Sequence, residues 1–256
     1  MIPASKKRNL PRRNAERPGS MRVFEYWCEP IPDASGNLPQ QLWDAAHEMQ
    51  AVWNRMTEAF REVTAPHAED YKARRAAVQA LDLKRIRAVA MQSRGVIPSR
   101  YYYHLADRFA LTLKGYQRRQ RERGAGPSHG APRFKGRLES LAIPEIFSRC
   151  VGDEVRWSQL FTGELPVRMR RMSRAGEARG EFRVSHGGVN AAVRLKVRLH
   201  REPAPNAIVK RVTLCGRYER SLGAHLAGWR WGLKFLIHEE DDSHYLREET
   251  GVVMKK

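Results

Sequence analysis

Two basic stretches of the sequence have the residue types and spacing to bind phosphate groups. In the first, residues 114–123 carry five Lys or Arg, and the next loop adds three cations around Phe134. The dipole of a helix C-terminus accounts for one or two cations, but not for five. We predict phosphate binding here, with Phe134 stacking on a base. The phosphate-binding candidates are Arg118, Arg119, Arg121, Arg123, Arg133, Lys135 and Arg137.

The second basic stretch, 168–201, holds ten Lys or Arg against Glu177 and Glu181. Side chains alternate along a strand, so cations two residues apart share one face at roughly 6–7 Å, close to the phosphate repeat of a nucleic-acid strand. A solvated strand face is the alternative interpretation. The candidates for phosphate binding are Arg170, Arg171, Arg194, Lys196 and Arg198.

No set of residues typical of catalysis or metal binding stands out. The acids are densest in 239–249, the nine histidines are dispersed, and the three cysteines, Cys28, Cys150 and Cys215, form no C-x-x-C pair. Nucleases need converging carboxylates, and zinc sites need paired cysteines or histidines. We therefore expect no catalytic residue, no metal ligand and no cofactor in this chain, and three reduced thiols.

The overall composition favours a folded protein with a polyanionic partner. The 256 residues carry a formal charge of +19 with 41% hydrophobic residues, which suffices for a core. Residues 1–238 alone hold 44 basic and 22 acidic residues. Such an excess favours nucleic acid as the partner. No apolar run reaches 18 residues and no secretion signal is recognisable, so a membrane span is excluded and a cytoplasmic location is expected.

The hydrophobic periodicity predicts three helices. Apolar residues recur every three or four positions from Leu42 to Val63, in a helix that starts at Pro39. A second helix is expected over roughly 68–92, and a third from Ser99 to about Arg123.

The rest of the chain has the patterns of strands. Aromatic and β-branched residues predict a strand at 22–28 that ends before Pro30. Hydrophobic alternation or β-branched residues predict further strands at 165–169, 193–199, 207–215 and 231–237.

These elements predict an α+β fold in which a helical block is inserted into an antiparallel β-barrel. The predicted parts are a disordered basic arm at 1–20, a β-domain at 21–38 and 133–238, a helical block at 39–132, and an acidic linker at 239–256.

The order of four segments resembles a known family. They are QQLWDAAHEMQAVWNRM in the first helix, SRYYYHLADRF in the third, PRFKGR at 132–137, and GWRWGLKFLIHEE at the last strand. Over roughly residues 21–245 the chain resembles the N-terminal half of compact type V CRISPR effectors and their TnpB relatives. PRFKGR after an arginine-rich helix is the most specific part.

This resemblance implies that the β-domain is an oligonucleotide-binding-like wedge domain and that the helices are a recognition lobe. Such a module would bind guide RNA and recognise double-stranded target DNA in the prokaryotic cytoplasm. The resemblance places Ser99, Arg100 and Tyr103 to face the DNA flanking motif, the 118–137 cluster to face backbone phosphates, and Arg194, Lys196 and Arg198 to contact guide RNA.

The sequence departs from that family because the RuvC nuclease segment is missing. Two hypotheses therefore stand beside that of a binding module. The chain is a subunit of a split nuclease, which cuts with Mg²⁺ only when a RuvC-bearing partner is present, or it is a general structured-RNA-binding protein.

Overall fold

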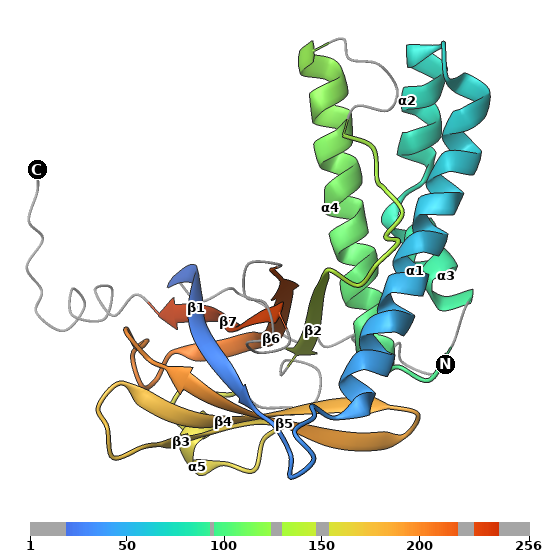
Figure 1. The fold of residues 1–256 in the computed structure, drawn as a ribbon. Coiled ribbons are helices and arrows are strands. Elements are labelled where there is room, and N and C mark those ends of the chain that lie inside the picture. Colours follow the sequence, from blue (N-terminus) through green and yellow to red (C-terminus); the bar gives the residue numbers. More distant parts are fainter. Residues whose placement is uncertain (1–18, 93–94, 124–129, 147–153, 220–227, 241–256) are drawn as a thin grey trace, which may run out of the picture.

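The computed structural model describes residues 19–92, 95–123, 130–146, 154–219 and 228–240. They form an α+β fold in which a seven-stranded antiparallel sheet curls into a half-barrel, and a block of helices rises beside it (Figure 1). The predicted α+β class is confirmed. Most of the predicted arm and linker lies outside the described residues, while Gly19 and Glu240 are the ends of β1 and β7.

The strands follow the order β2-β6-β7-β1-β5-β4-β3 across the sheet, and every neighbouring pair is antiparallel. They are β1 Gly19–Ile31, β2 Ser140–Ile146, β3 Val167–Arg171, β4 Glu177–His186, β5 Val189–Arg198, β6 Ile208–Tyr218 and β7 Trp229–Glu240.

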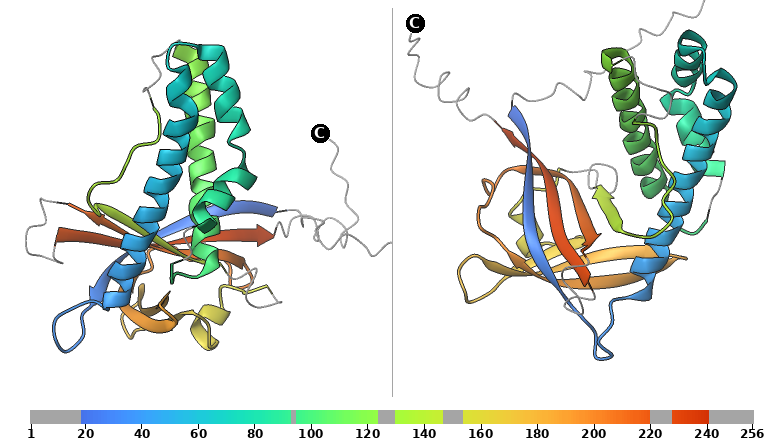
Figure 2. Two further views of the ribbon diagram at one scale, coloured as in Figure 1. Left: turned by 90° about the vertical axis from the view of Figure 1, so that its right-hand side faces the viewer. Right: turned by 45° about the horizontal axis from the view of Figure 1, so that its top comes forward.

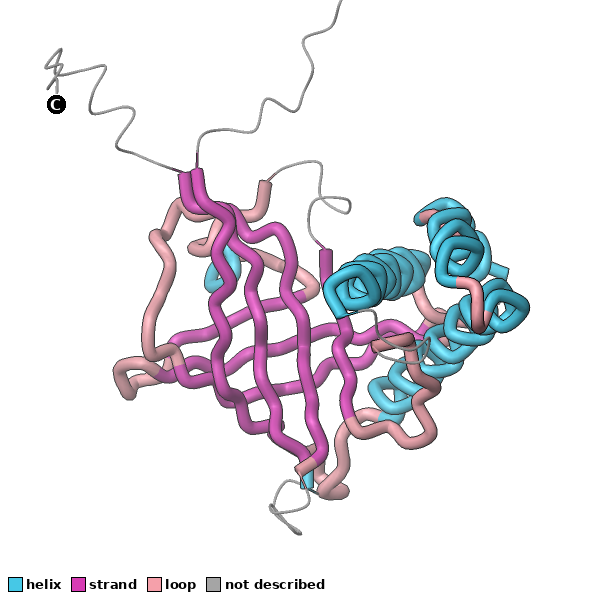
Figure 3. Tube along the Cα trace, turned by 90° about the horizontal axis from the view of Figure 1, so that it is seen from above, coloured by secondary structure: helices cyan, strands magenta, loops and turns pink. Residues whose placement is uncertain are grey.

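Strand β1 curls the sheet because it changes partner along its length. It pairs with β7 from Gly19 to Cys28 and with β5 from Cys28 to Ile31. The strands β6, β7 and β1 therefore cross over the layer of β5, β4 and β3 (Figure 3). The prediction that the strand ends before Pro30 is wrong, because beyond Cys28 β1 has a partner on one side only, where proline is tolerated.

The main core lies between the two layers of the half-barrel. Tyr26, Trp157 and Phe235 pack there with ring centroids 5.1–6.0 Å apart. The predicted alternation is confirmed in β5 and β7, whose inward side chains are buried: Val193, Leu195, Val197, Trp231, Leu233, Phe235 and Ile237.

Four helices, α1 to α4, lie between β1 and β2 in the sequence. Helices α1 and α4 lie side by side and both rise away from the sheet (Figure 2). The helices are α1 Gln40–Thr64, α2 Tyr71–Ala80, α3 Leu83–Gln92 and α4 Ser99–Arg123, and two short elements add η1 Ala65–His67 and α5 Gln159–Thr162.

The single helix predicted over 68–92 is wrong, because two aspartates start separate helices there. The Oδ1 of Asp70 accepts a hydrogen bond from the Ala73 amide (3.0 Å), and Asp82 does the same for Arg85 (2.8 Å). Between them Leu81 leaves helical geometry at ψ 63°. Capping by the second aspartate therefore outweighs the helical pattern of the alanines.

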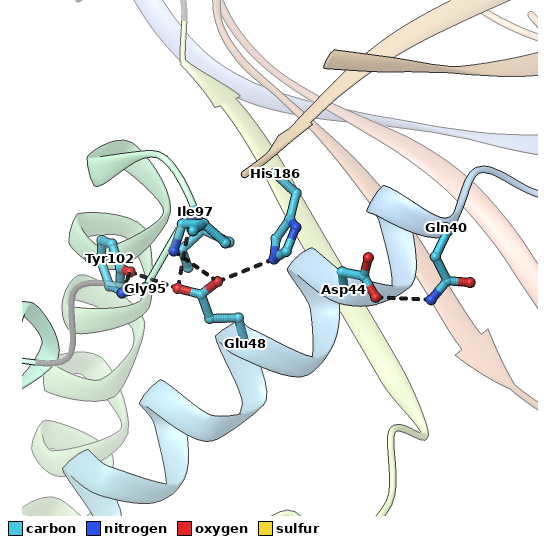
Figure 4. A network of polar contacts seen from close by, with 8 residues as sticks. Gln40, Asp44, Glu48, Gly95, Ile97, Tyr102 and His186 are labelled. Carbon is cyan, nitrogen blue, oxygen red and sulfur yellow. Dashed lines mark hydrogen bonds and ion pairs between the residues drawn. The ribbon is translucent and has the colours of Figure 1, made fainter. Parts of the chain in front are cut away.

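Glu48 of α1 joins the helical block to the sheet (Figure 4). Its Oε1 accepts a hydrogen bond from the Tyr102 hydroxyl at 2.7 Å, and its Oε2 accepts one from the Val96 amide at 3.2 Å. The same Oε2 lies 3.3 Å from Nε2 of His186 at the end of β4. One carboxylate thus holds α1, α4 and the β4–β5 hairpin in a fixed arrangement.

Candidate nucleic-acid interface

The predicted phosphate-binding loop is held against α1 by its backbone. Asn54 binds both backbone polar groups of one residue, because its Oδ1 accepts from the Lys135 amide (2.8 Å) and its Nδ2 donates to the Lys135 carbonyl (3.0 Å). Gln50 Nε2 donates to the same carbonyl at 2.7 Å, and Trp53 Nε1 donates to the Arg133 carbonyl at 3.1 Å. These contacts are made to the backbone of the loop and do not occupy its side chains.

The side chains of this loop are presented in different ways. Arg133 and Arg137 are exposed. The half-exposed Phe134 ring has the guanidinium of Arg61 4.3 Å from its centroid, and Lys135 Nζ lies 4.6 Å from the Trp53 ring centroid. Phe134 is therefore accessible, while Lys135 is partly covered.

The four arginines predicted at the end of α4 do not share one role. Arg118 and Arg121 are exposed, and the Arg123 side chain lies outside the described part of the chain. Arg119 Nη2 donates to the Gly130 carbonyl at 3.1 Å, which ties the loop to α4. Gly130 has a φ of +74°, and a Cβ there would lie 2.3 Å from Arg119 Nε, so a larger residue would be strained and would displace Arg119.

The residues predicted at the start of α4 lie at the junction of the helices and the sheet. Ser99 is exposed, and Tyr103 packs under Arg87, whose Cζ lies 5.5 Å from the ring centroid. Arg100 Nη2 lies 3.1 Å from Oε2 of Glu145 in β2. Arg100 is therefore engaged in an ion pair inside the protein.

A groove lined by cations lies between α4 and the outer face of β2, β6 and β7. Its two adjoining hollows, of about 340 and 210 Å³, share Arg108, Cys215 and Lys234. A third hollow continues along α1 to the loop. The cations that line the three hollows are Arg108, Lys135, Arg137, Arg211 and Lys234.

The groove has few carboxylates to balance these cations. Among the described residues that line it, Asp107 is the one acid, and it is bound to Arg87 at 2.9 Å. Lys234 is paired with Glu25 at 3.0 Å. The groove therefore carries a net positive charge before any ligand enters.

The pKa values of groove residues reflect burial among cations. Burial, and then the charge of Arg108, lower the pKa of both Lys135 and Arg211. Burial, followed by the charges of Arg211 and Arg108, lowers the pKa of His104 to about 4. A phosphate entering the groove would relieve this repulsion.

The neutral His104 ring faces a guanidinium. Arg211 Nη1 lies 3.5 Å from its Nδ1, and because a guanidinium can only donate, this contact favours the tautomer with the proton on Nε2. This Nε2 is buried and has no hydrogen-bond partner among the described residues. Burial raises the pKa of the nearby Cys215 thiol, which is therefore protonated at neutral pH.

The second predicted surface, made of residues of β3 and β5, is more nearly neutral than its sequence suggests. Lys196 lies 3.6 Å from Glu177, and Arg198 lies 3.3 Å from Glu29. Arg171 donates two hydrogen bonds of 2.7 Å to Glu202. Within the described residues Arg170 and Arg194 form no ion pair.

The sequence interpretation missed three of the five groove cations: Arg108, Arg211 and Lys234. They are far apart in the chain and each lies in an otherwise ordinary helix or strand. Only the packing of α4 over the sheet brings them together, and no local signal could have indicated it.

Comparison with models of protein families and with curated proteins finds no match to this sequence. Among the described helices, none has the length and apolar character needed to cross a membrane. The described residues contain no group of three or more His, Cys, Asp or Glu placed to hold a metal ion. The site must therefore be interpreted from its own chemistry.

Proposed function

We propose that the chain is the guide-RNA-binding and target-DNA-recognition module of an RNA-guided effector of the type V CRISPR or TnpB kind, without a nuclease site of its own. In this proposal the curled sheet is the oligonucleotide-binding-like wedge and α1 to α4 are the recognition lobe. The observation that carries the nucleic-acid part of the proposal is the groove of poorly balanced cations between them.

The groove favours phosphate over other anions because its positive charges follow a path. They extend from Arg211 in β6, past Arg108 of α4, to Lys135 and Arg137 in the loop. A chain of phosphates matches such a path better than a single small anion does. The resemblance to the effector family, and not the groove, supplies the guide RNA and the flanking-motif DNA as specific partners, and Mg²⁺ enters only with a RuvC-bearing partner.

The experiment is to purify the chain, sequence the RNA that copurifies, and measure its affinity against salt. If six to ten phosphates are neutralised, the log–log slope should be about −5 to −9. A repeat-derived guide supports the proposal, whereas unrelated structured RNAs favour a general RNA-binding protein. A slope near zero contradicts nucleic-acid binding altogether.

Two matched triple variants compare the two basic surfaces. Changing the groove cations Arg108, Arg211 and Lys234 to Gln should reduce the slope by about 2, because Lys234 is already paired with Glu25 and the other two are not paired with a carboxylate among the described residues. The same change at Arg194, Lys196 and Arg198 should reduce it less, because two of these three are paired with carboxylates. Equal reductions would mean that the ion pairs do not affect binding.

A further inference from the structure

Trp27 is an exposed tryptophan at a position of β1 where the strand does not require one. It points outward from β1 and is 51% exposed, while its neighbours Tyr26 and Cys28 point into the core and are buried. Tryptophan is usually buried, and an exposed indole is a common binding side chain. The sequence interpretation did not single it out.

The surroundings of Trp27 lead directly to the groove. Trp27 is paired across the sheet with Gly232, which has no side chain to cover the ring. Gly232 is paired with Cys215 of β6, and Cys215 with Ala142 of β2. Cys215 and Ala142 line the groove beneath α4. A floor of small residues therefore joins the indole to the basic groove.

Two cations flank Gly232 along β7, one on each side. The Arg230 guanidinium lies over the indole, with its Cζ 4.7 Å from the centroid. Lys234, on the same face of β7, is two residues from Gly232, which is roughly 7 Å along a strand. That distance is close to the spacing of successive phosphates. Both cations have carboxylate partners, the partly exposed Glu219 and the exposed Glu25, in surface pairs that a phosphate can replace at little cost.

We propose that Trp27 is a stacking platform for an unpaired nucleobase of a strand whose phosphates occupy the groove. This inference rests on the proposed nucleic-acid binding and adds a preference for unpaired nucleotides. An indole stacks on any base but can reach only a base that is not already enclosed in a duplex. The guanidinium of Arg230 either stays stacked on the ring or moves to a phosphate as the base enters.

The test measures fluorescence anisotropy with four kinds of labelled probe. They are a 12-nucleotide RNA, the DNA of the same sequence, a series of RNAs of this sequence that each lack the base at one position, and the 12-base-pair duplex. Trp27→Ala should weaken binding of the intact single strands about tenfold, the loss of one base–ring stack, and leave the duplex within twofold. Trp27→Phe should retain most of the affinity, since it keeps a ring. Met21→Ala, on the same strand and face and 54% exposed, is the matched control and should change nothing.

The abasic probes test stacking itself. With the unchanged protein, one abasic position should weaken binding about as much as Trp27→Ala does, and with Trp27→Ala that position should have no further effect. If Trp27→Ala lowers the affinity for the RNA and DNA strands equally, Trp27 contacts the base alone. If it lowers the affinity for RNA only, the stacked base belongs to an RNA strand.

Several results would overturn the inference. In the first, the abasic position still weakens binding to the Trp27→Ala protein, so that the two effects multiply. In the second, Trp27→Ala lowers the affinity equally for single strands and for the duplex. In the third, Trp27→Ala causes no loss of affinity at all. In the last case a protein surface becomes the better explanation of the exposed indole. If the groove variant still shows its reduced salt slope, the proposed function survives that failure. If the unchanged protein binds none of the probes, both proposals are wrong.

Discussion

The ion pair between Arg100 and Glu145 decides whether Arg100 is available to contact DNA. Glu145 is 1% exposed and the Arg100 side chain is 25% exposed, with 3.1 Å between their charged atoms. At an effective dielectric constant of about 20, such a pair attracts by about 5 kcal/mol. If Arg100 moved to a DNA phosphate, it would leave a buried carboxylate without its partner.

We expect Arg100→Met to lower the free energy of unfolding by about 2–4 kcal/mol, since breaking a buried pair leaves one charge uncompensated and Arg100 is partly solvated. Arg198→Met breaks an exposed pair with Glu29 of similar geometry and should cost about 0.5 kcal/mol or less. The double change Arg100→Met with Glu145→Gln should recover much of the loss, because it removes the buried charge as well. Urea denaturation with a constant slope is the assay.

The pH dependence of the free energy of unfolding tests the same ion pair in a second way. Burial raises the pKa of Glu145, and Arg100 opposes this increase. In Arg100→Met the pKa should therefore rise further, so the native state binds a proton at a pH where the unfolded chain does not. Stability then falls as the pH rises through that window, which begins at the ordinary value of 4.5. The deficit of Arg100→Met should shrink between pH 7.5 and pH 5. A deficit no larger than that of Arg198→Met, or one independent of pH, would refute this reasoning.

Two further predictions concern the walls of the groove. Asn54→Ala removes both hydrogen bonds to the Lys135 backbone, so we expect a loss of about 1–2 kcal/mol in stability and faster hydrogen exchange at the Lys135 amide; unchanged exchange there would show that the loop is held by other contacts. His104 has a folded pKa of about 4, below its ordinary 6.5, so the unfolded state binds its proton first and stability should fall as the pH drops from 6.5 to 4, by up to about 3 kcal/mol. Thermal unfolding of the protein and of His104→Gln against pH measures this, and parallel profiles would contradict it.

Local patterns predicted much of the fold because they act within one element. The apolar stripe from Leu42 to Val63 and the alternation around Leu195 each need only the periodicity of one helix or strand. Strand β4 was missed because two of its four buried inward positions are Ala178 and Gly180, which give almost no hydrophobic signal. Strand β2 was missed too, and its Pro144 is unfavourable in a strand pattern.

The candidate site was only partly predictable for a different reason. Lys135 and Arg137 are close in sequence to other cations, so their cluster was visible. Arg211 and Arg108 are about a hundred positions apart, and the groove between them exists only after α4 packs over the sheet. The glutamates that neutralise Lys196 and Arg198 come from β4 and β1, so the sequence overstated the charge of that face.

The net charge of +19 does not measure how strongly the protein binds phosphate, because the cations differ in the partners that they already have. An exposed arginine already paired with a glutamate gains little from a phosphate, because one weak surface pair replaces another. Arg211 and Lys135 are partly desolvated and repelled by Arg108, so a phosphate placed among them removes repulsion and adds attraction in a less polar setting. A minority of the cations should therefore account for most of the binding energy. Because these residues come from α4, β6 and the loop held by Asn54, that energy depends on the helical block staying docked on the sheet through Glu48.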